Sequence, residues 1–409
     1  MGTPQNPDFD YIVVGSGAGG GPVASNLAIA GYKVGLIEAG QAPEPPCYSV
    51  PVFHPWASED PEMSWEFFVR HYSDKERSLR DEKRFIKEKD GVFYPRAGTL
   101  GGCTAHHAMI TIYGHNSDWD DIAKETGDAS WKADNMRRYF ERIERCGYVK
   151  KPAAGQPNPT RHGYDGWLST TGPDLKLAFG DPALLETVLD AVKGAWKQGV
   201  GNSVLPQFIP RDPNDWRTPE FEGICFAPLA TLKGRRAGTR ELINDTRAVY
   251  PNLIVKMSHL ATKIVFEGKK AIGVECLAGQ HLYKADPQAN GNAAGAEKKT
   301  YYAAREIILA GGTFNSPQLL MLSGIGPPDQ LAALGIPIVE PRAGVGTNLQ
   351  DRYEIGVVSE MKQNWKVIKD ATFKPPLPNE QGDPCYVDWQ NGKGVYTTNG
   401  AVLAVIKKS

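Results

Sequence analysis

One stretch, residues 11–40, constrains the fold of this chain more than any other. It reads YIVVGSGAGGGPVASNLAIAGYKVGLIEAG. A short apolar run precedes three glycines spaced G-x-G-x-x-G, and small and apolar residues at helical spacing lead to a second apolar run. This order predicts a parallel strand, a tight turn, a helix and a second parallel strand, the unit from which doubly wound α/β sheets are built.

The glycines and the acid that follows them have distinct expected tasks. Gly15 permits the tight turn, Gly17 lets the backbone approach a pyrophosphate, and Gly20 lets helix and strand pack closely. The start of the helix attracts phosphate. Glu38, at the end of the second strand, is placed to bind the ribose hydroxyls and would repel the 2′-phosphate of NADP. An ordinary glycine turn can show the same spacing, but the order of elements favours a dinucleotide site, either NAD or FAD.

Composition and charge limit the classes of protein to which this chain can belong. A chain of 409 residues, 41% of them apolar, has room for two or three domains. Its net charge of −1 gives no electrostatic reason to expect nucleic acid as a partner. The polar N-terminus and the absence of a long apolar run predict no secretory signal and no membrane span, so we expect a cytoplasmic protein. Six scattered cysteines without C-x-x-C predict reduced thiols and no metal site.

Two further segments are rich in glycine. Residues 94–114 read YPRAGTLGGCTAHHAMITIYG, and their small residues predict backbone N–H groups laid along an extended cofactor beyond its adenosine half. Isolated histidines are more often surface or core residues, but the glycine turn favours a site role for His106 and His107. Residues 305–310 predict a buried strand that runs into Gly311 and a helix, a second backbone approach to the cofactor.

Other segments predict supporting structure. Within residues 134–144, Met136, Tyr139, Phe140 and Ile143 recur at helical spacing, so we expect a helix that buries these four and exposes its charged residues. Residues 252–275 alternate as strands of a small antiparallel sheet beside the dinucleotide sheet. Residues 280–299 are polar and predict a surface loop.

The three glycine-rich segments together resemble the glucose-methanol-choline (GMC) oxidoreductases. The resemblance rests on residues 11–40, on RAGTLGGCTAHHAM (residues 96–109) and on GGTFNSPQLLMLSGIGP (residues 311–327). It implies that the cofactor is FAD and that the protein is similar to choline dehydrogenase or alcohol oxidase. The implied cofactor-binding residues are Gly15, Ser16, Gly17, Ala18, Gly20, Glu38, Ala39, Arg96, Gly98, Thr99, Gly102, Cys103, His106, His107, Ala108, Met109, Ala261, Gly311, Gly346 and Asn348.

At three positions, family members differ from one another or this chain departs from the usual family residue. Some relatives bond a histidine covalently to the flavin at the position of His106, so His106 is a covalent candidate; a packing histidine is the alternative. His107 stands where many members have asparagine. Arg352 stands where the family usually has histidine after Asp351, which puts local contacts with the flavin or between domains in doubt.

The resemblance also implies an architecture. We expect an α/β Rossmann-type FAD-binding domain from residues 1–155 and 226–351. A second, discontinuous substrate domain of α+β character, built on an antiparallel sheet, takes residues 156–225 and 352–409 and is incomplete.

The implied activity is oxidation of a small alcohol, choline-like, aromatic or sugar, to a carbonyl by hydride transfer to flavin N5. Oxygen or another electron acceptor would then oxidise the flavin. The family's base histidine is expected beyond Ser409, so no catalytic base is assigned. Two alternatives are open: a lyase of the same fold that retains FAD without redox turnover, and a non-catalytic flavin-binding fragment.

Overall fold

A computed structural model of the chain divides into two units that alternate along the sequence. Unit 1 comprises Met1–Glu44, Trp56–His106 and Gly238–Val357, and unit 2 comprises Pro45–Pro55, His107–Ala237 and Val358–Ser409. The structure describes residues 6–81, 84–174, 177, 180–197, 210–218, 221–289, 291–351 and 354–407. The assignment of one domain to FAD and one to substrate stays a prediction.

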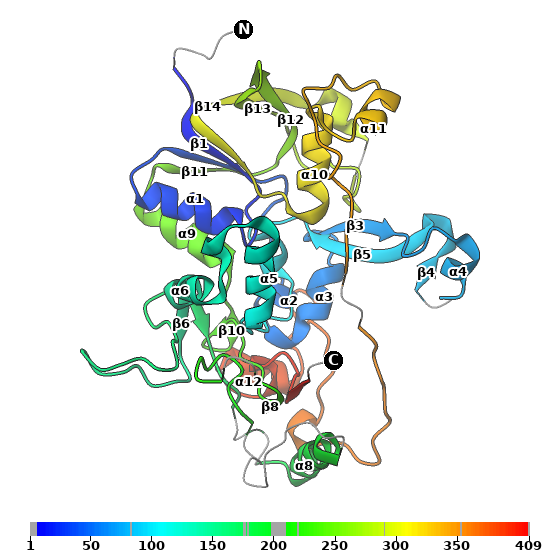
Figure 1. Ribbon diagram of the computed structural model, residues 1–409. Coiled ribbons are helices and arrows are strands. Elements are labelled where there is room, and N and C mark those ends of the chain that lie inside the picture. The colour runs from blue at the N-terminus through cyan, green and yellow to red at the C-terminus, as the bar shows by residue number, and fades with distance from the viewer. Residues whose placement is uncertain are drawn as a thin grey trace. The chain divides into compact units, whose positions relative to one another are not determined.

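Unit 1 is built on a six-stranded sheet in the order β11-β2-β1-β14-β13-β12 (Figure 1). Its strands and helices are β1 (Phe9–Val14), α1 (Gly20–Ile29), β2 (Val34–Ile37), β3 (Ser64–Val69), α4 (Lys75–Leu79), β4 (Phe85–Ile86), β5 (Gly91–Ala97), α9 (Thr239–Val249), β11 (Leu253–Lys256), β12 (His259–Glu267), β13 (Lys270–Ala278), β14 (Glu297–Leu309), α10 (Gly312–Leu322), β15 (Ile325–Gly326), α11 (Pro328–Ala333) and β16 (Glu340–Pro341).

The first four strands of this sheet are parallel, and they include β1 and β2, the two parallel strands that the opening stretch predicts. Successive side chains of a strand alternate between faces, and β1 buries both of its faces. Val13 joins a core cluster with Ala24 of α1 and Ile243 of α9. Ile12 and Val14 join another cluster, which includes Leu319 of α10. Helices therefore cover both faces, which explains why the strand sequence is almost wholly apolar.

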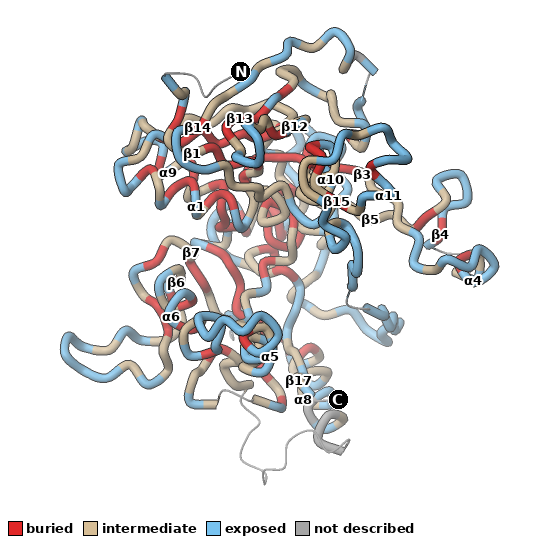
Figure 2. The backbone as a smooth tube through the Cα atoms, turned by 45° about the horizontal axis from the view of Figure 1, so that its top comes forward, coloured by how far each residue is buried: buried red, intermediate tan, exposed pale blue. Residues whose placement is uncertain are grey.

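The separate antiparallel sheet predicted over residues 252–275 is wrong, because β11 pairs parallel with β2 and the antiparallel strands β12 and β13 are joined to the parallel strands through β14. The first half of β14 pairs antiparallel with β13, and its second half pairs parallel with β1. The strand begins at Glu297, so the loop predicted over residues 280–299 is wrong at its end. The first four residues of β14 are consecutive polar residues and are largely exposed, so their composition is that of a surface loop. Figure 2 shows buried segments along β1 and β13.

Unit 2 contains helices and short two-stranded sheets. Its elements are α2 (Pro46–Ser49), α5 (Asn116–Thr126), α6 (Ala133–Ile143), β6 (Glu144–Cys146), β7 (Leu168–Thr170), α8 (Pro182–Lys197), β8 (Gly223–Cys225), β9 (Thr231–Leu232), β10 (Arg235–Arg236), α12 (Pro384–Gln390) and β17 (Ala404–Ile406). The pairs β9–β10 and β8–β17 are antiparallel, whereas β6 and β7 are parallel. Helix α3 (His54–Glu59) crosses the sequence boundary between the units.

Helix α6 forms where the spacing predicts it, but its buried face differs from the prediction. Tyr139 is 55% exposed, whereas Arg137 is 1% exposed. The guanidinium of Arg137 donates hydrogen bonds to the carbonyl oxygens of Thr160, Arg161 and Asn214. These three acceptors satisfy a buried charge, which helical spacing cannot reveal.

Candidate cofactor site

The first glycine turn holds β1, α1 and the end of β14 at close range. Gly15 has φ +98°, and a Cβ placed on it would lie 2.3 Å from the carbonyl oxygen of Ala310. A Cβ on Gly20 would lie 1.9 Å from the oxygen of Gly15. Both distances are far below contact, so only glycine fits at these two positions.

The second glycine turn packs against the first. Gly102 has φ +53°, and a Cβ on it would lie 2.6 Å from the Cα of Gly17. The backbone N–H of Gly101 donates to Ser16 Oγ at 3.0 Å. Two segments 85 residues apart in the sequence therefore form one continuous surface of backbone.

Glu38 is buried and hydrogen-bonded at the end of β2. Its Oε2 accepts from the backbone N and from the Oγ of Ser16, at 3.1 and 2.5 Å, and its Oε1 accepts from Gly40 N at 2.9 Å. Burial raises the pKa of Glu38, and these hydrogen bonds oppose the rise. The Glu38 carboxylate follows the last residue of β2 and lies on the lining of the cavity described next.

A cavity of about 540 Å³ lies within unit 1 between these elements. It is bordered by the N-terminal ends of two helices, at Gly17 and Ala18 before α1 and at Gly311 and Gly312 where α10 begins. Free backbone N–H groups and the helix dipole make each of these ends favourable for an anion. The cavity therefore combines two phosphate-favouring ends with one ribose-favouring carboxylate.

Arg96 adds a cationic group to this cavity. Its guanidinium lies 4.7 Å from the ring centre of Tyr94 and 5.9 Å from that of Phe314. Its Nε is buried and has no hydrogen-bond partner within the described residues. A buried donor without an acceptor is costly, so this atom fits a polar or anionic ligand group. The residues present therefore fit a dinucleotide such as FAD.

Comparison with known proteins decides the family. A family model described as GMC oxidoreductase matches residues 9–354, most of the chain. The chain belongs to the GMC oxidoreductase family. This confirms the resemblance drawn from the three glycine-rich segments.

Curated GMC relatives are longer than this chain. It is 30% identical over 361 residues to an oxygen-dependent choline dehydrogenase of Brucella anthropi, covering 87% of this chain and 55% of the relative. It is 29% identical to an uncharacterised GMC-type oxidoreductase of Mycobacterium bovis, covering 91% of this chain and 59% of the relative. The chain thus spans a little over half the length of the curated relatives it matches.

Solved structures agree on the fold. A fungal aryl-alcohol oxidase superposes with a TM-score of 0.69 at 20% identity, covering 98% of this chain and 62% of that one. An FAD-dependent oxidoreductase from Chaetomium thermophilum gives 0.67 at 23% identity, covering 97% and 61%. These likenesses confirm a GMC-type α/β fold.

Part of the predicted GMC site comes together at the cavity, and residues that sequence reasoning missed complete its lining. The predicted residues on the lining are Gly15, Ser16, Gly17, Ala18, Glu38, Ala39, Arg96, Gly102, Cys103, Ala261 and Gly311. The missed ones include Trp65, His259, Tyr283 and Phe314. They come from separate strands and loops, and no local pattern marks them; whether any of these residues binds a cofactor stays a prediction.

Other predicted residues serve packing. Gly20 closes the first turn, as described above. A Cβ on Gly98 would lie 2.5 Å from the ring of Trp65. Thr99 is fully buried, donates to Gln41 O and accepts from Arg240 Nη2. None of the three lines the cavity.

The remaining predicted residues lie elsewhere. His106 is 9% exposed and ends the second segment of unit 1, but is not on the cavity lining. His107, Ala108 and Met109 belong to unit 2. The last two predicted positions, Gly346 and Asn348, are exposed in unit 1. Arg352 lies outside the described residues, while Asp351 accepts a 2.6 Å hydrogen bond from Tyr94.

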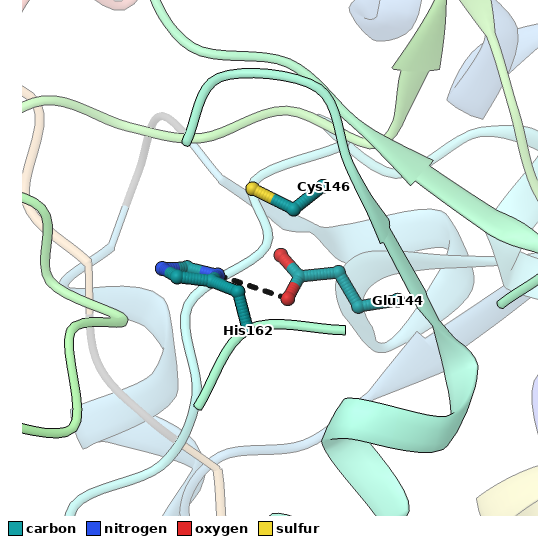
Figure 3. A group of neighbouring side chains, drawn as sticks. All are labelled: Glu144, Cys146 and His162. Carbon is teal, nitrogen blue, oxygen red and sulfur yellow. Dashed lines mark hydrogen bonds and ion pairs between the residues drawn. The ribbon is translucent and has the colours of Figure 1, made fainter. Parts of the chain in front are cut away.

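A second polar cluster lies in unit 2, where Glu144, Cys146 and His162 meet with ligand-type atoms within 4.8 Å of one another (Figure 3). His162 donates from Nδ1 to Glu144 and from Nε2 to Asp212, both at 2.9 Å. Burial opposes charge on the ring, but these bonds outweigh it and raise the pKa of His162 to about 11. Both ring nitrogens lie against carboxylate oxygens, so the cluster is described here as a buried network of ion pairs and hydrogen bonds.

Two further observations concern the cysteines and the helices. The six cysteines, all within the described ranges, form no disulfide. Among the described residues, no helix combines the length and apolar character needed to cross a bilayer.

Proposed function

We propose that this chain binds FAD in the cavity of unit 1 and forms the cofactor-binding part of an enzyme that oxidises a small alcohol to a carbonyl. The observation that carries the proposal is the meeting of Glu38 with two helix N-termini at one cavity, in a chain of the GMC family. FAD is the cofactor. Glu38 would hold the ribose, and the turns at Gly17 and Gly311 would hold the pyrophosphate.

The reaction follows from the cofactor and the family. Bound FAD supplies an acceptor for the hydride that leaves the alcohol carbon. The part of this chain is to bind and orient the cofactor and to exclude water from it. Choline dehydrogenase and aryl-alcohol oxidase relatives support an alcohol as substrate. We also propose that oxygen or another electron acceptor reoxidises the flavin and that the protein is cytoplasmic. We assign no catalytic base.

Gly17 provides the sharpest test of the FAD site. A Cβ on Gly17 would meet no described atom closer than Gly102 Cα at 3.7 Å, so Gly17→Ala should fold. Its methyl group would occupy space that a pyrophosphate needs. We expect FAD binding, followed by flavin fluorescence, to weaken at least tenfold, which corresponds to about 1.4 kcal/mol. Gly194→Ala, in α8 with no atom within 4 Å of the added Cβ, is the control and should bind FAD normally.

The redox half of the proposal needs a separate measurement. FAD-loaded protein is mixed without oxygen with choline or benzyl alcohol, and flavin absorbance is followed. Bleaching by either alcohol supports alcohol oxidation. Bound flavin that neither alcohol bleaches would count against it and favour the non-redox alternatives, a lyase or a non-catalytic flavin-binding fragment.

We also propose His106 as a covalent attachment point for the flavin. Attachment would replace one hydrogen of the 8α methyl group by a ring nitrogen of His106, and the two electrons released would pass through the flavin to oxygen. Flavin should then stay with the polypeptide after acid precipitation and be released from His106→Ala. Release from the unmodified chain would exclude the bond.

A further inference from the structure

The cofactor cavity of unit 1 extends beyond the turns that favour phosphate. Gln318 lines it six residues after Gly312, the first residue of α10. At 1.5 Å per residue, this is about 9 Å further along the helix axis. His259 lines the same cavity, and its backbone N–H donates to Glu38 O at 2.9 Å. The cavity therefore continues beside Glu38 and along α10, away from the N-terminus of that helix.

A nucleotide would fill this part of the cavity with its base. The ribose of a nucleotide joins the base to the phosphates. With the pyrophosphate at the two helix N-termini and the ribose at Glu38, as proposed above, the base would occupy the part that Gln318 and His259 line. The side chains in this part decide which base fits.

Two aromatic rings line the cavity beside Gln318. Trp65 of β3 and Tyr283 have ring centres 5.3 Å apart, with their planes at 74°. The hydroxyl of Tyr283 donates to Gln318 Oε1 at 3.0 Å, so both rings belong to the same part of the cavity as Gln318. Aromatic side chains bind nucleobases by stacking, because every base has a π face.

Tyr283 comes from a segment whose polar composition predicts a surface loop. The segment, residues 279–289, follows β13 and is attached to the chain around β3. Glu66 donates its backbone N–H to Ala285 O at 2.7 Å, and Gln288 Nε2 donates to Pro61 O at 3.1 Å. These two bonds hold the segment where the Tyr283 ring lines the cavity.

Gln318 is suited to hydrogen-bond the edge of a base. Among the described residues its side chain has one hydrogen-bond partner, the Tyr283 hydroxyl, which uses one lone pair of Oε1. The ring nitrogens of His259 are already engaged, Nδ1 with Met257 O at 2.7 Å and Nε2 with the Tyr301 hydroxyl at 3.0 Å. A glutamine amide matches adenine, which presents a donor at N6 and an acceptor at N7. Guanine presents acceptors at both corresponding positions.

We propose that Trp65, Tyr283 and Gln318 form an adenine pocket, in which the two rings stack against the base and the Gln318 amide hydrogen-bonds its edge. The pocket rests on the proposed function and deepens it, because it selects the adenine of FAD over other bases. It also gives residues 279–289 a role, since they supply one of the two stacking rings.

The hydrogen-bonding role of Gln318 is tested by nucleotide preference. ADP and GDP are titrated separately into the full chain, and binding is measured by calorimetry. We expect the wild type to bind ADP at least tenfold more tightly than GDP, and Gln318→Leu to lose this preference. Gln330→Leu, at an exposed glutamine of α11 away from the cavity lining, is the control and should keep it. An undiminished preference in Gln318→Leu would remove Gln318 from the pocket.

The stacking role of Tyr283 is tested with a pair of variants at the same position. Tyr283→Leu should weaken the binding of both ADP and FAD about 5- to 100-fold, the range that base–aromatic stacking gives. Tyr283→Phe keeps the ring and should restore most of that affinity. Tyr139→Leu, at a 55% exposed tyrosine of α6, is the control and should bind as the wild type does.

Equal affinities in Tyr283→Leu and Tyr283→Phe would overturn the stacking role. Tyr283→Met, which is closer to tyrosine in length, replaces Tyr283→Leu if that variant does not fold. The two proposals can fail separately. Wild-type protein that binds ADP but not FAD would contradict the proposed function and leave the pocket intact. Protein that binds FAD but shows no preference for ADP over GDP would overturn the pocket and leave the proposed function intact.

Discussion

Ser16 and Glu38 are joined twice, because both the backbone N–H and the Oγ–H of Ser16 donate to Oε2 of Glu38. Ser16 Oγ also accepts from Gly101 N, so this one hydroxyl links the first glycine turn, the end of β2 and the second glycine turn. Three segments far apart in the sequence thus depend on a single side-chain oxygen.

Ser16→Ala should destabilise the chain by about 1–3 kcal/mol, because the buried Gly101 N–H loses its acceptor. Urea unfolding measures the loss. Ser25→Ala is the matched control: Ser25 is equally buried on α1, and its Oγ has no hydrogen-bond partner among the described residues. It should change stability little or increase it. Equal losses in both variants would contradict the role given to Ser16.

The stability contribution of Glu38 should depend on pH. Its folded pKa lies above 4.5, mainly through burial, so between 4.5 and the folded value the native state binds more protons than the unfolded state. The contribution of Glu38 to the free energy of unfolding is therefore largest at low pH and is lost as pH rises through the folded pKa. The difference in unfolding free energy, wild type minus Glu38→Gln, should fall as pH rises from 4 to 8. A rising difference would show the opposite shift.

FAD affinity should also depend on Glu38. A hydrogen bond to a charged group contributes about 1.5–3 kcal/mol, so Glu38→Gln should weaken FAD binding roughly 10- to 100-fold. Titration followed by flavin fluorescence at pH 8 measures this loss. Glu44→Gln, on a residue away from the cavity lining, should bind FAD as the wild type does. Unaltered affinity in Glu38→Gln would remove Glu38 from the ribose site.

Arg137→Met should destabilise the chain by about 3–5 kcal/mol, because one buried and two partly buried backbone carbonyl groups lose their donor. Arg138→Met is the matched control on the next residue of α6, where a 69% exposed side chain pairs with Asp134 at 3.5 Å. An exposed pair of this kind contributes about 0–1 kcal/mol. Chemical unfolding of both variants decides whether burial or charge accounts for the difference.

The His162 network should weaken in alkali. The folded pKa of about 11 lies above the ordinary value of 6.5, so the stabilisation is complete below 6.5 and is lost as pH rises through about 11. The stability advantage of the wild type over His162→Gln should therefore shrink between pH 7 and 11. An advantage that stays constant across this range would show that the folded ring is not charged.

Local backbone requirements made much of unit 1 predictable. Gly15 and Gly102 have positive φ, and a Cβ on either would clash with neighbouring backbone atoms. The spacing of these glycines in the sequence therefore predicts the turns directly. The apolar runs at β1 and β2 predicted strands buried on both faces, because a parallel sheet covered by helices leaves no polar side. Helix α6 formed at its predicted place for the same kind of local reason, the recurrence of apolar residues every three to four positions.

What the sequence by itself determined is the order of strand, turn and helix, the family and the glycine-lined part of the site. Only the tertiary structure decided which residues complete that site and which charges are buried. Trp65 and Tyr283 line one cavity from separate segments, and the buried Arg137 donates to three backbone carbonyl groups. Hydrogen bonds and cavity linings made by residues far apart in the sequence leave no local pattern, because the folded chain and not the sequence spacing brings these residues together.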